Sequence, residues 1–198
     1  MERTVVFLDN GYLSKISKYF GGKQPYKVDL KQLAITLSKE KGLWCLHTYL
    51  YTAPPYQSPS PTSDEIRRKA NHDYWVSKLR RINDFTVREG RYQKCGKNDY
   101  QQKGVDTLLT MDLSKLPLTH KGIPKIIVLA CDTDFVPILN DLRASNHIKV
   151  ILAYFTDKVR HSEFSMSNHI LTACDDTIVL TKEHFEKSKY ISPNSKPI

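Results

Sequence analysis

Lys125-Ile126-Ile127-Val128-Leu129-Ala130-Cys131 is the stretch of the sequence that decides the fold, and Asp132-Thr133-Asp134 follows it directly. The stretch is apolar almost throughout, which is typical of a strand buried on both faces of a parallel sheet. A second apolar run, residues 4–8, ends at Asp9 in the same manner. Short apolar runs alternate with helical patterns along the chain, which is the signature of βαβ units. We therefore predict an α/β fold with a mainly parallel central sheet and helices on both faces.

The remaining elements follow from the spacing of apolar residues and from helix start and stop signals. Residues 52–63 contain four prolines and are predicted to form a loop. Asn10 and Gly11 are predicted to turn the chain after the first strand. One domain is expected over residues 1–185, with 186–198 as a flexible C-terminal tail. The predicted strands are 4–8, 44–51, 85–92, 125–131, 148–155 and 177–180, and the predicted helices are 29–41, 64–81, 104–116, 135–144 and 163–173.

One helix start is marked by Thr62 and Glu65, which have the spacing of a capping box. The apolar residues that follow recur at helical spacing, so they predict the stripe that this helix buries. The predicted stripe consists of Ile66, Ala70, Tyr74, Trp75 and Leu79.

The chain is basic, because 30 Lys and Arg against 21 Asp and Glu give a formal net charge of +9 over 198 residues. An excess of this size indicates a polyanionic partner such as RNA, although a soluble protein that is merely basic has the same composition. The four cysteines lie far apart, which argues against a zinc knuckle and a disulfide framework. No segment has the apolar pattern of a signal peptide or membrane span, so we expect a cytoplasmic protein without a membrane partner. The sequence leaves open whether the chain forms a homo-oligomer.

Carboxylates follow two of the predicted strands, at the point where each strand ends. In an open α/β sheet, ligands bind beyond the carboxyl ends of the strands where the strand order reverses, so Asp9, Asp132 and Asp134 are predicted to share one crevice. Residues two apart in an extended stretch point the same way, so Asp132 and Asp134 are expected to face it together. Clustered carboxylates repel one another unless a cation lies among them, and their oxygens favour Mg²⁺ or Mn²⁺. The alternative for each aspartate alone is a helix N-cap.

A fourth carboxylate, Asp106, lies in the first turn of the helix predicted at 104–116. Its alternative role is to interact with the helix dipole. Asp112 lies six residues further on, about 240° around the helix, so the two side chains do not face one metal ion. We therefore predict that Asp106 is a metal ligand and that Asp112 either contacts the metal ligands without binding the ion itself or lies at the surface.

Three separated motifs resemble the NYN family of PIN-like nucleases, in the order that the family has them. The motifs are VVFLDN (5–10), KGVDTLLTMDL (103–113) and IIVLACDTDFVPIL (126–139), and the resemblance extends over residues 4–181. It implies a Rossmann-like PIN fold, an acidic metal centre and RNA as the substrate class. It also implies metal-site positions at Asp9, Asp106, Asp132 and Asp134, with Asn10 adjacent.

The chain departs from the family pattern in one motif. Where the family usually has Ser-Gly-Asp-Ser-Asp-Phe, residues 130–135 read Ala-Cys-Asp-Thr-Asp-Phe. Cys131 replaces a glycine and Thr133 replaces a serine, but both aspartates remain and Thr133 keeps a hydroxyl group. We predict Asn10, Thr133 and Asp112 as secondary residues of the site.

A basic segment precedes Asp106 and is predicted to bind RNA. Its cations can hold phosphates, and the tyrosines Tyr92 and Tyr100 among them can stack on unpaired bases. The alternative is a solvated edge strand whose charges block aggregation. The predicted RNA-binding residues are Arg88, Arg91, Lys94, Lys97 and Lys103.

The predicted function is a metal-dependent endoribonuclease that hydrolyses RNA phosphodiester bonds with Mg²⁺ or Mn²⁺ and leaves 5′-phosphate and 3′-hydroxyl ends. Two alternatives are an RNA-binding PIN-like module with little or no turnover and a glycosyltransferase that uses an Asp-x-Asp pair. A phosphatase with Asp-x-Asp after its first strand does not fit, because Asn10 and Gly11 follow Asp9. The chain has no Walker motif and no Gly-x-Ser-x-Gly, and its seven histidines show neither metal-ligand spacing nor clustering.

Overall fold

The computed structural model describes residues 1–96, 100–157, 159 and 162–191. Six parallel strands form one sheet in the order β3-β2-β1-β6-β7-β8, and β4 and β5 form a separate antiparallel hairpin. The prediction of a mainly parallel sheet is therefore confirmed. The sheet strands are β1 (Glu2–Asp9), β2 (Leu43–Thr52), β3 (Phe85–Glu89), β6 (Lys125–Leu129), β7 (Lys149–Tyr154) and β8 (Asp176–Val179), and the hairpin strands are β4 (Arg91–Lys94) and β5 (Tyr100–Lys103).

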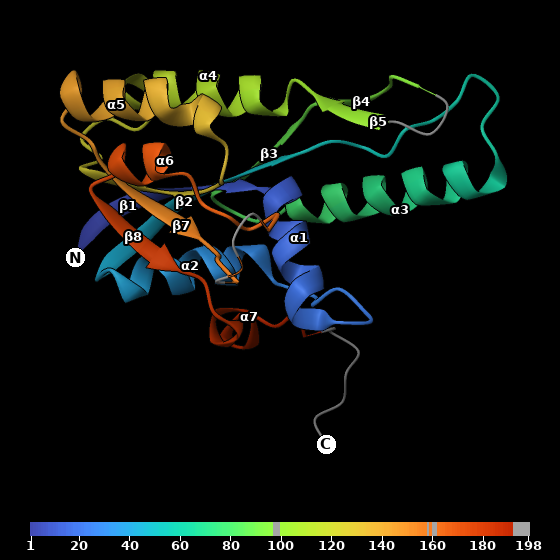
Figure 1. The fold of residues 1–198 in the computed structure, drawn as a ribbon, viewed down its shortest axis with the longest axis horizontal. Helices are drawn as coiled ribbons and strands as arrows, with labels where there is room; N and C mark the ends of the chain where they lie inside the picture. The colour runs from blue at the N-terminus through green and yellow to red at the C-terminus, as the bar shows by residue number, and fades with distance from the viewer. Residues whose placement is uncertain (97–99, 158, 160–161, 192–198) are drawn as a thin grey trace.

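Helices cover both faces of the sheet (Figure 1). One face packs against α1, α2, α7 and the end of α3, and the opposite face packs against α4, α5 and α6. The helices are α1 (Asn10–Gly21), α2 (Leu30–Glu40), α3 (Ser63–Leu79), α4 (Val105–Thr119), α5 (Val136–Ala144), α6 (Asn168–Thr172) and α7 (Lys182–Lys187), with the 3₁₀ helix η1 (Thr133–Phe135) before α5. None of the described helices is long and apolar enough to cross a membrane.

The centre of the sheet is buried on both sides because successive side chains of a strand point to opposite faces. In β1, Val6 and Leu8 join the core beneath α1 and α2, whereas Val5 and Phe7 join the core beneath α4 and α5. The neighbouring β6 is fully buried from Ile126 onward. This burial confirms the prediction from the apolar stretch at residues 125–131, although the strand ends at Leu129.

The strand order reverses between β1 and β6. The chain proceeds from β1 outward to β2 and β3, and then returns to the other side of β1 with β6, β7 and β8. The carboxyl ends of β1 and β6 therefore lie side by side at the topological switch point, where open parallel sheets bind their ligands.

Two elements after β1 and β3 differ from the predictions. Asn10 and Gly11 do not turn the chain but begin α1, because the Asp9 side chain caps the helix and Leu13 and Ile16 pack into the core. The strand predicted over 85–92 is divided at Gly90, whose amide donates to the Thr52 carbonyl. A Cβ at Gly90 would lie 2.5 Å from the Lys103 carbonyl oxygen, so this glycine lets the base of the hairpin close.

The capping box of α3 is confirmed, because Thr62 accepts from the Glu65 amide and the Glu65 carboxylate accepts from the Thr62 amide. Its predicted apolar stripe is partly wrong. Ile66 and Tyr74 are 53% and 63% exposed, because most of α3 extends away from the sheet. Only the C-terminal turns of the helix reach the core.

The C-terminal part of the chain also differs from the sequence-based boundaries. The helix predicted over 163–173 is shorter, since α6 begins after the cap at Ser167. The predicted boundary between residues 185 and 186 falls inside α7, whose Phe185 is fully buried. Ser188 accepts from the Asp29 amide and Tyr190 donates to the Lys27 carbonyl, so the packed chain extends to Tyr190.

Candidate active site

Asp9 ends β1 at the switch point and is half-buried. Its Oδ1 accepts a hydrogen bond of 2.8 Å from the Gly11 amide, which makes Asp9 the N-cap of α1. Burial first, and then the negative charges of Asp106 and Asp132, raise the pKa of Asp9 to about 6 against the lowering effect of the Gly11 and Tyr12 amides. Asp9 is therefore the N-cap of α1, and its carboxylate also lies within the electrostatic influence of Asp106 and Asp132.

Asp132 and Asp134 lie just beyond the end of β6 and are exposed. Asp132 caps η1 by accepting a 2.9 Å hydrogen bond from the Asp134 amide. The extended stretch predicted through both residues is wrong, because Asp132 is extended but Asp134 lies in the 3₁₀ helix. Asp132 acts electrostatically on both Asp9 and Asp106, whereas Asp134 acts on Asp106.

Asp106 lies in the first turn of α4, next to the two aspartates that follow β6. Gly104 precedes this helix with a left-handed φ of 81° and offers no side-chain cap. Partial burial raises the pKa of Asp106, and the charges of Asp132 and then Asp134 add to this effect. Asp106 therefore connects the other carboxylates into one group, which we call the acidic centre: Asp9, Asp106, Asp132 and Asp134.

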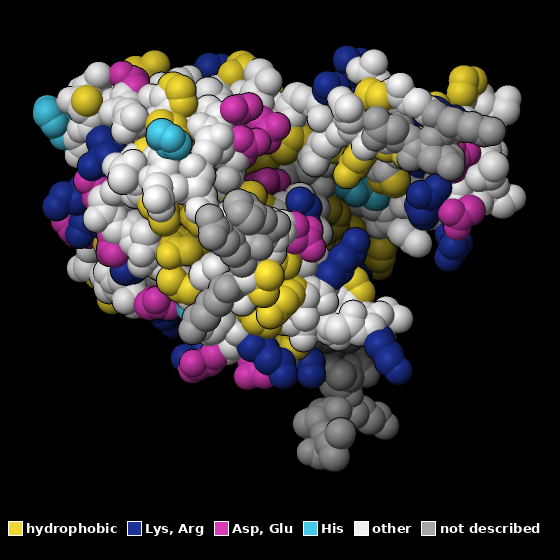
Figure 2. Space-filling model, viewed as in Figure 1, with side chains coloured by type: hydrophobic (Ala, Val, Ile, Leu, Met, Phe, Trp, Pro, Cys, Tyr) yellow, Lys and Arg dark blue, Asp and Glu magenta, His cyan; other side chains and the backbone are white. Residues whose placement is uncertain are grey.

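The acidic centre is open. A hollow of about 360 Å³ adjoins it between α4 and the start of α5, lined by Asp106, Thr110, Asp134 and Phe135 among others. Figure 2 shows acidic side chains beside a hollow that separates the sheet and its helices from the part formed by α3 and the hairpin. Among the residues that the structure describes, no three His, Cys, Asp or Glu side chains are grouped closely enough to form a finished metal cage.

The secondary residues occupy different positions around this centre. The Asn10 side chain donates to the Thr52 hydroxyl at 3.1 Å, which ties the start of α1 to the end of β2. Thr133 is exposed in η1 between the two aspartates. Cys131, which precedes them, is partly buried near Asp9, and burial raises the pKa of its thiol to about 11.

Asp112 faces away from the acidic centre, as helix geometry predicts. Its Oδ2 accepts from the Tyr51 hydroxyl at 3.0 Å and lies 3.0 Å from Nε of Arg88. The Arg88 N–H does not point at this oxygen, so the two charges form an ion pair without a hydrogen bond. Arg88 is thus engaged by Asp112, and we leave it out of the proposed RNA-binding surface.

The other predicted RNA-binding residues lie on the β4–β5 hairpin, but on its two different faces. Residues opposite each other in an antiparallel pair share a face, and Arg91 lies opposite Lys103. Lys94 lies opposite Tyr100 and so belongs to the other face. Lys97 is outside the described residues. The predicted basic segment is therefore not one continuous surface.

Gln102 is a residue of the site that the sequence does not reveal. It lies on the hairpin face of Lys94 and Tyr100, opposite Tyr92. A Cβ built on Gly11 would lie 3.2 Å from Oδ1 of Asp9 and 3.4 Å from Oε1 of Gln102. The hairpin therefore places an amide side chain directly beside the acidic centre.

Two histidines are close together elsewhere, which corrects the expectation that none are clustered. The ring centroids of His47 and His120 are 5.4 Å apart. His47 contacts the Thr86 hydroxyl and His120 contacts the Tyr49 hydroxyl. Burial lowers the pKa of both rings. The pair lies near the middle of β2, away from the strand end where the acidic centre lies.

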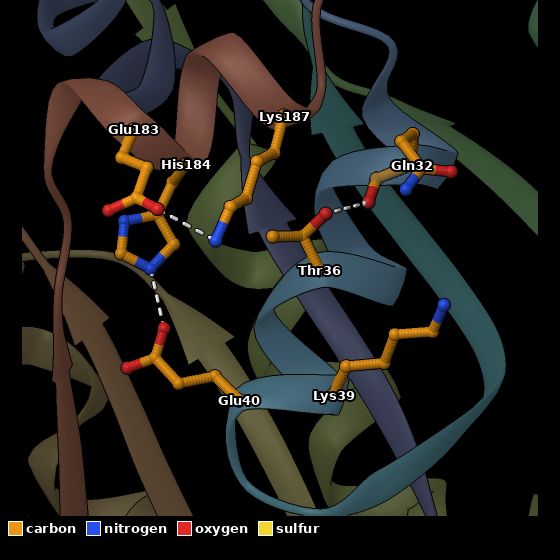
Figure 3. A pocket seen from close by; sticks show the side chains of 7 residues that line it. All are labelled: Gln32, Thr36, Lys39, Glu40, Glu183, His184 and Lys187. Atoms are coloured by element: carbon orange, nitrogen blue, oxygen red, sulfur yellow. Dashed lines mark hydrogen bonds and ion pairs between the residues drawn. The ribbon is translucent and has the colours of Figure 1, made fainter.

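A larger hollow of about 570 Å³ lies between α2 and α7 (Figure 3). His184 accepts from the Thr181 amide through Nδ1, so its Nε2 donates to Glu40 at 2.6 Å. Lys187 pairs with Glu183 at 2.8 Å. The His184–Glu40 contact holds α7 against α2, and the Lys187–Glu183 pair lies within α7, so we assign this hollow a structural role.

Replacing Asp9 by asparagine is expected to stabilise the metal-free protein at pH 7 by about 1–3 kcal/mol. Because the folded-state pKa is raised, the wild type loses stability as the pH rises from 3.8 to about 6, and the full penalty applies above that. Asparagine carries no charge and can still accept the Gly11 hydrogen bond. Urea unfolding in EDTA at pH 4 and pH 7 measures the difference.

The control for this experiment is Asp141→Asn, on the exposed side of α5. It removes a carboxylate outside the acidic centre and should leave the free energy of unfolding nearly unchanged. An Asp9→Asn protein that is less stable than the wild type at pH 7 would contradict the prediction.

Comparison of the sequence with known protein families identifies one that matches this chain. The model of the NYN domain family matches residues 3–181, nearly the whole chain, and NYN domains are generally nucleases. No curated protein matches the sequence. The fold is similar to that of a crystal structure of a protein of unknown function from Vibrio parahaemolyticus, with a TM-score of 0.59 over 92% of this chain and 95% of that chain. The two sequences are 10% identical, so this likeness concerns the fold alone.

Proposed function

The chain belongs to the NYN domain family, and on that premise we propose that it is a metal-dependent endoribonuclease whose active site is the acidic centre. The observation that carries the proposal is the electrostatic coupling of the aspartates. The pKa values of Asp9 and Asp106 are raised by burial and by neighbouring carboxylates, so these charges repel one another at neutral pH. A bound cation would remove this repulsion.

The donor chemistry of the centre fits a divalent cation. Carboxylate oxygens are hard ligands, and Mg²⁺ usually keeps several waters while one or two protein carboxylates hold it, so a closed cage is not required. Asp9, Asp106, Asp132 and Asp134 would hold Mg²⁺ or Mn²⁺. When bound, such an ion supplies Lewis-acid stabilisation of the phosphate and activation of water.

The remaining residues of the site would position the RNA. Lys94 is an exposed cation on the hairpin face of Gln102, so it can contact a phosphate next to the reacting one. Arg91 and Lys103 are exposed cations on the opposite face, where they would contact another part of the RNA strand. The Gln102 amide is placed to hydrogen-bond a phosphate oxygen beside Asp9. Asn10 holds α1 against β2, which fixes the Asp9 cap relative to the sheet.

The alternative is an RNA-binding PIN-like module with little or no turnover. The observation that favours it is the open arrangement of the carboxylates in the described part of the chain. A glycosyltransferase that uses Asp132 and Asp134 alone is less consistent with the structure. It gives no role to the carboxylates of Asp9 and Asp106, whose charges interact with those of the other aspartates.

Incubation of the purified protein with end-labelled single-stranded RNA separates the two readings. We expect internal cleavage with Mn²⁺ or Mg²⁺ and none in EDTA, because the carboxylates alone provide no electrophile. RNA that is bound but stays intact at every metal concentration would favour the binding module. An Asp106→Asn preparation made in parallel shows whether any cleavage comes from a contaminating nuclease.

A further inference from the structure

A pocket of about 420 Å³ lies between the β4–β5 hairpin, the loop after β2 and the first turns of α3. In Figure 1 the loop passes between the hairpin and α3. The pocket volume is within the range of small-molecule sites. It is lined by Pro55 and Tyr56 from the loop, Glu65 and Arg68 from α3, and Tyr92 and Tyr100 from the hairpin.

Three tyrosine rings dominate the wall of this pocket. The ring centroids of Tyr56 and Tyr100 are 5.1 Å apart with an interplanar angle of 49°, so the two rings do not stack on each other. Tyr92 and Tyr100 remain 37% and 43% exposed. Partly exposed aromatic rings in a concave site are suited to stacking on a flat aromatic ligand.

The charges around the pocket favour a base over a phosphate group inside it. Glu65 accepts hydrogen bonds from Ser58 and from the Thr62 amide, and these bonds lower its pKa, so the carboxylate is ionised. Arg68 in the same wall is paired with Asp64 at 2.9 Å, so it does not offset Glu65. The negative charge of Glu65 disfavours a phosphate, whereas a neutral base is tolerated. Lys94 lies 6.0 Å from the centroid of the Tyr100 ring, so a cation is available for the backbone of the same nucleotide.

The pocket and the acidic centre lie along one face of the hairpin. Tyr92, Lys94, Tyr100 and Gln102 share this face, and Gln102 is beside Asp9. Tyr100 and Gln102 are two residues apart in β5, which corresponds to about 7 Å. An RNA strand that follows this face can therefore have one phosphate at the acidic centre and a nearby base in the pocket.

We propose that Tyr56, Tyr92 and Tyr100 form a pocket for one unpaired nucleobase near the scissile phosphate, so that the protein selects single-stranded RNA. This inference rests on the proposed function. A base in a duplex is stacked and paired and cannot enter such a pocket, whereas a single strand offers its bases freely.

The test is equilibrium binding of a short single-stranded RNA that contains the fluorescent base 2-aminopurine, measured with the full-length Asp106→Asn protein so that no cleavage occurs. Tyr100→Ala is expected to weaken binding by roughly 5- to 150-fold and to remove the quenching of 2-aminopurine. Tyr100→Phe keeps the ring and should bind like the parent protein. Tyr74→Ala, at an exposed tyrosine on α3 outside the pocket, is the matched control.

A second set of variants separates stacking from charge. Lys94→Ala, on the hairpin face that carries Tyr100 and Gln102, should lower the slope of log affinity against log salt by about one unit for the lost phosphate contact. Tyr56→Ala and Tyr92→Ala should weaken binding without changing that slope. Thermal unfolding of each variant shows whether the fold is kept, and Tyr92→Ala provides an independent answer if Tyr100→Ala does not fold.

The outcomes distinguish this inference from the proposed function. Unchanged binding in both Tyr92→Ala and Tyr100→Ala, or equal affinity for double-stranded RNA, would overturn the base pocket even if the wild type cleaves RNA. Tyrosine-dependent binding in a protein that never cleaves would support the pocket and refute the endoribonuclease.

Discussion

Replacing Asp9, Asp106, Asp132 or Asp134 by asparagine, one at a time, is expected to lower RNA cleavage at least about 100-fold. Loss of a residue that only supports a metal ligand costs up to about 100-fold, so loss of a ligand itself should cost at least as much. The four residues come from the end of β1, the start of α4 and the segment after β6, yet the charges of Asp9 and Asp106 are coupled to the others. Asparagine is similar in size but carries no charge. Each variant thus removes one anionic ligand with little change in shape.

The fold of these variants should persist. Asp9 and Asp132 are helix caps, and asparagine caps a helix about as well as aspartate does. Initial cleavage rates at saturating Mn²⁺ measure the effect, and titration with Mn²⁺ followed by calorimetry reports the loss of metal affinity directly. Thermal unfolding in EDTA confirms that each protein is folded.

The matched control is Asp112→Asn, in the same helix as Asp106. Asp112 contacts Tyr51 and Arg88 instead of the acidic centre, so this variant should keep most of its activity and lose some stability. Asp141→Asn, on exposed α5, should change neither property. Normal cleavage by two of the four acidic-centre variants would refute the assignment, and complete loss in Asp112→Asn would show that the two faces of α4 are not independent.

RNA cleaved by this protein is expected to carry 5′-phosphate and 3′-hydroxyl ends. Ribonucleases that work without metal let the 2′-hydroxyl of the substrate attack, with histidine or lysine as acid and base, and leave a 2′,3′-cyclic phosphate. The described side chains that we assign to the reacting phosphate are carboxylates and the Gln102 amide, and none of them is a histidine or a lysine. Hydrolysis by water does not use the 2′-hydroxyl, so a single deoxyribose at the cleaved position should reduce binding without stopping the reaction.

Analysis of the ends by phosphatase treatment and mass spectrometry tests this prediction. EDTA should stop cleavage, Mn²⁺ or Mg²⁺ should restore it, and Ca²⁺ should restore it poorly because it is larger and takes more ligands. The control is the His47→Ala and His120→Ala double variant, since these rings form the close histidine pair. It should cleave like the wild type. Cyclic-phosphate ends that persist in EDTA and disappear in the double variant would assign the chemistry to the histidines.

The sequence alone determined the features that depend on local patterns. The apolar stretch before Asp132 indicates a strand buried on both faces, and Thr62 with Glu65 indicates the start of α3, because burial and capping act over a few neighbouring residues. The same logic places Asp9 and Asp132 at strand ends. Since parallel strands present their carboxyl ends at one edge, the sequence predicts that these aspartates lie at the same edge of the sheet.

Local patterns were misleading where packing overrides propensity. Asn10 and Gly11 are common turn residues, yet they begin α1 because the helix buries Leu13 and Ile16. The segment 85–92 has a continuous strand pattern, yet Gly90 lets the chain leave the sheet and form the hairpin base. Neither choice can be made without the neighbouring elements.

Only the tertiary structure decided which side chains meet across long stretches of chain. The sequence around each residue predicts RNA binding for Arg88 and a secondary role in the site for Asp112. The packing of α4 on β2 and β3 instead pairs the two side chains. Gln102 reaches Asp9, and Tyr56 joins Tyr100, through contacts between the hairpin and segments that are distant in the sequence. Propensity and burial pattern are local properties of the chain, whereas the partner of a polar or aromatic side chain is set by strand order, hairpin register and helix docking.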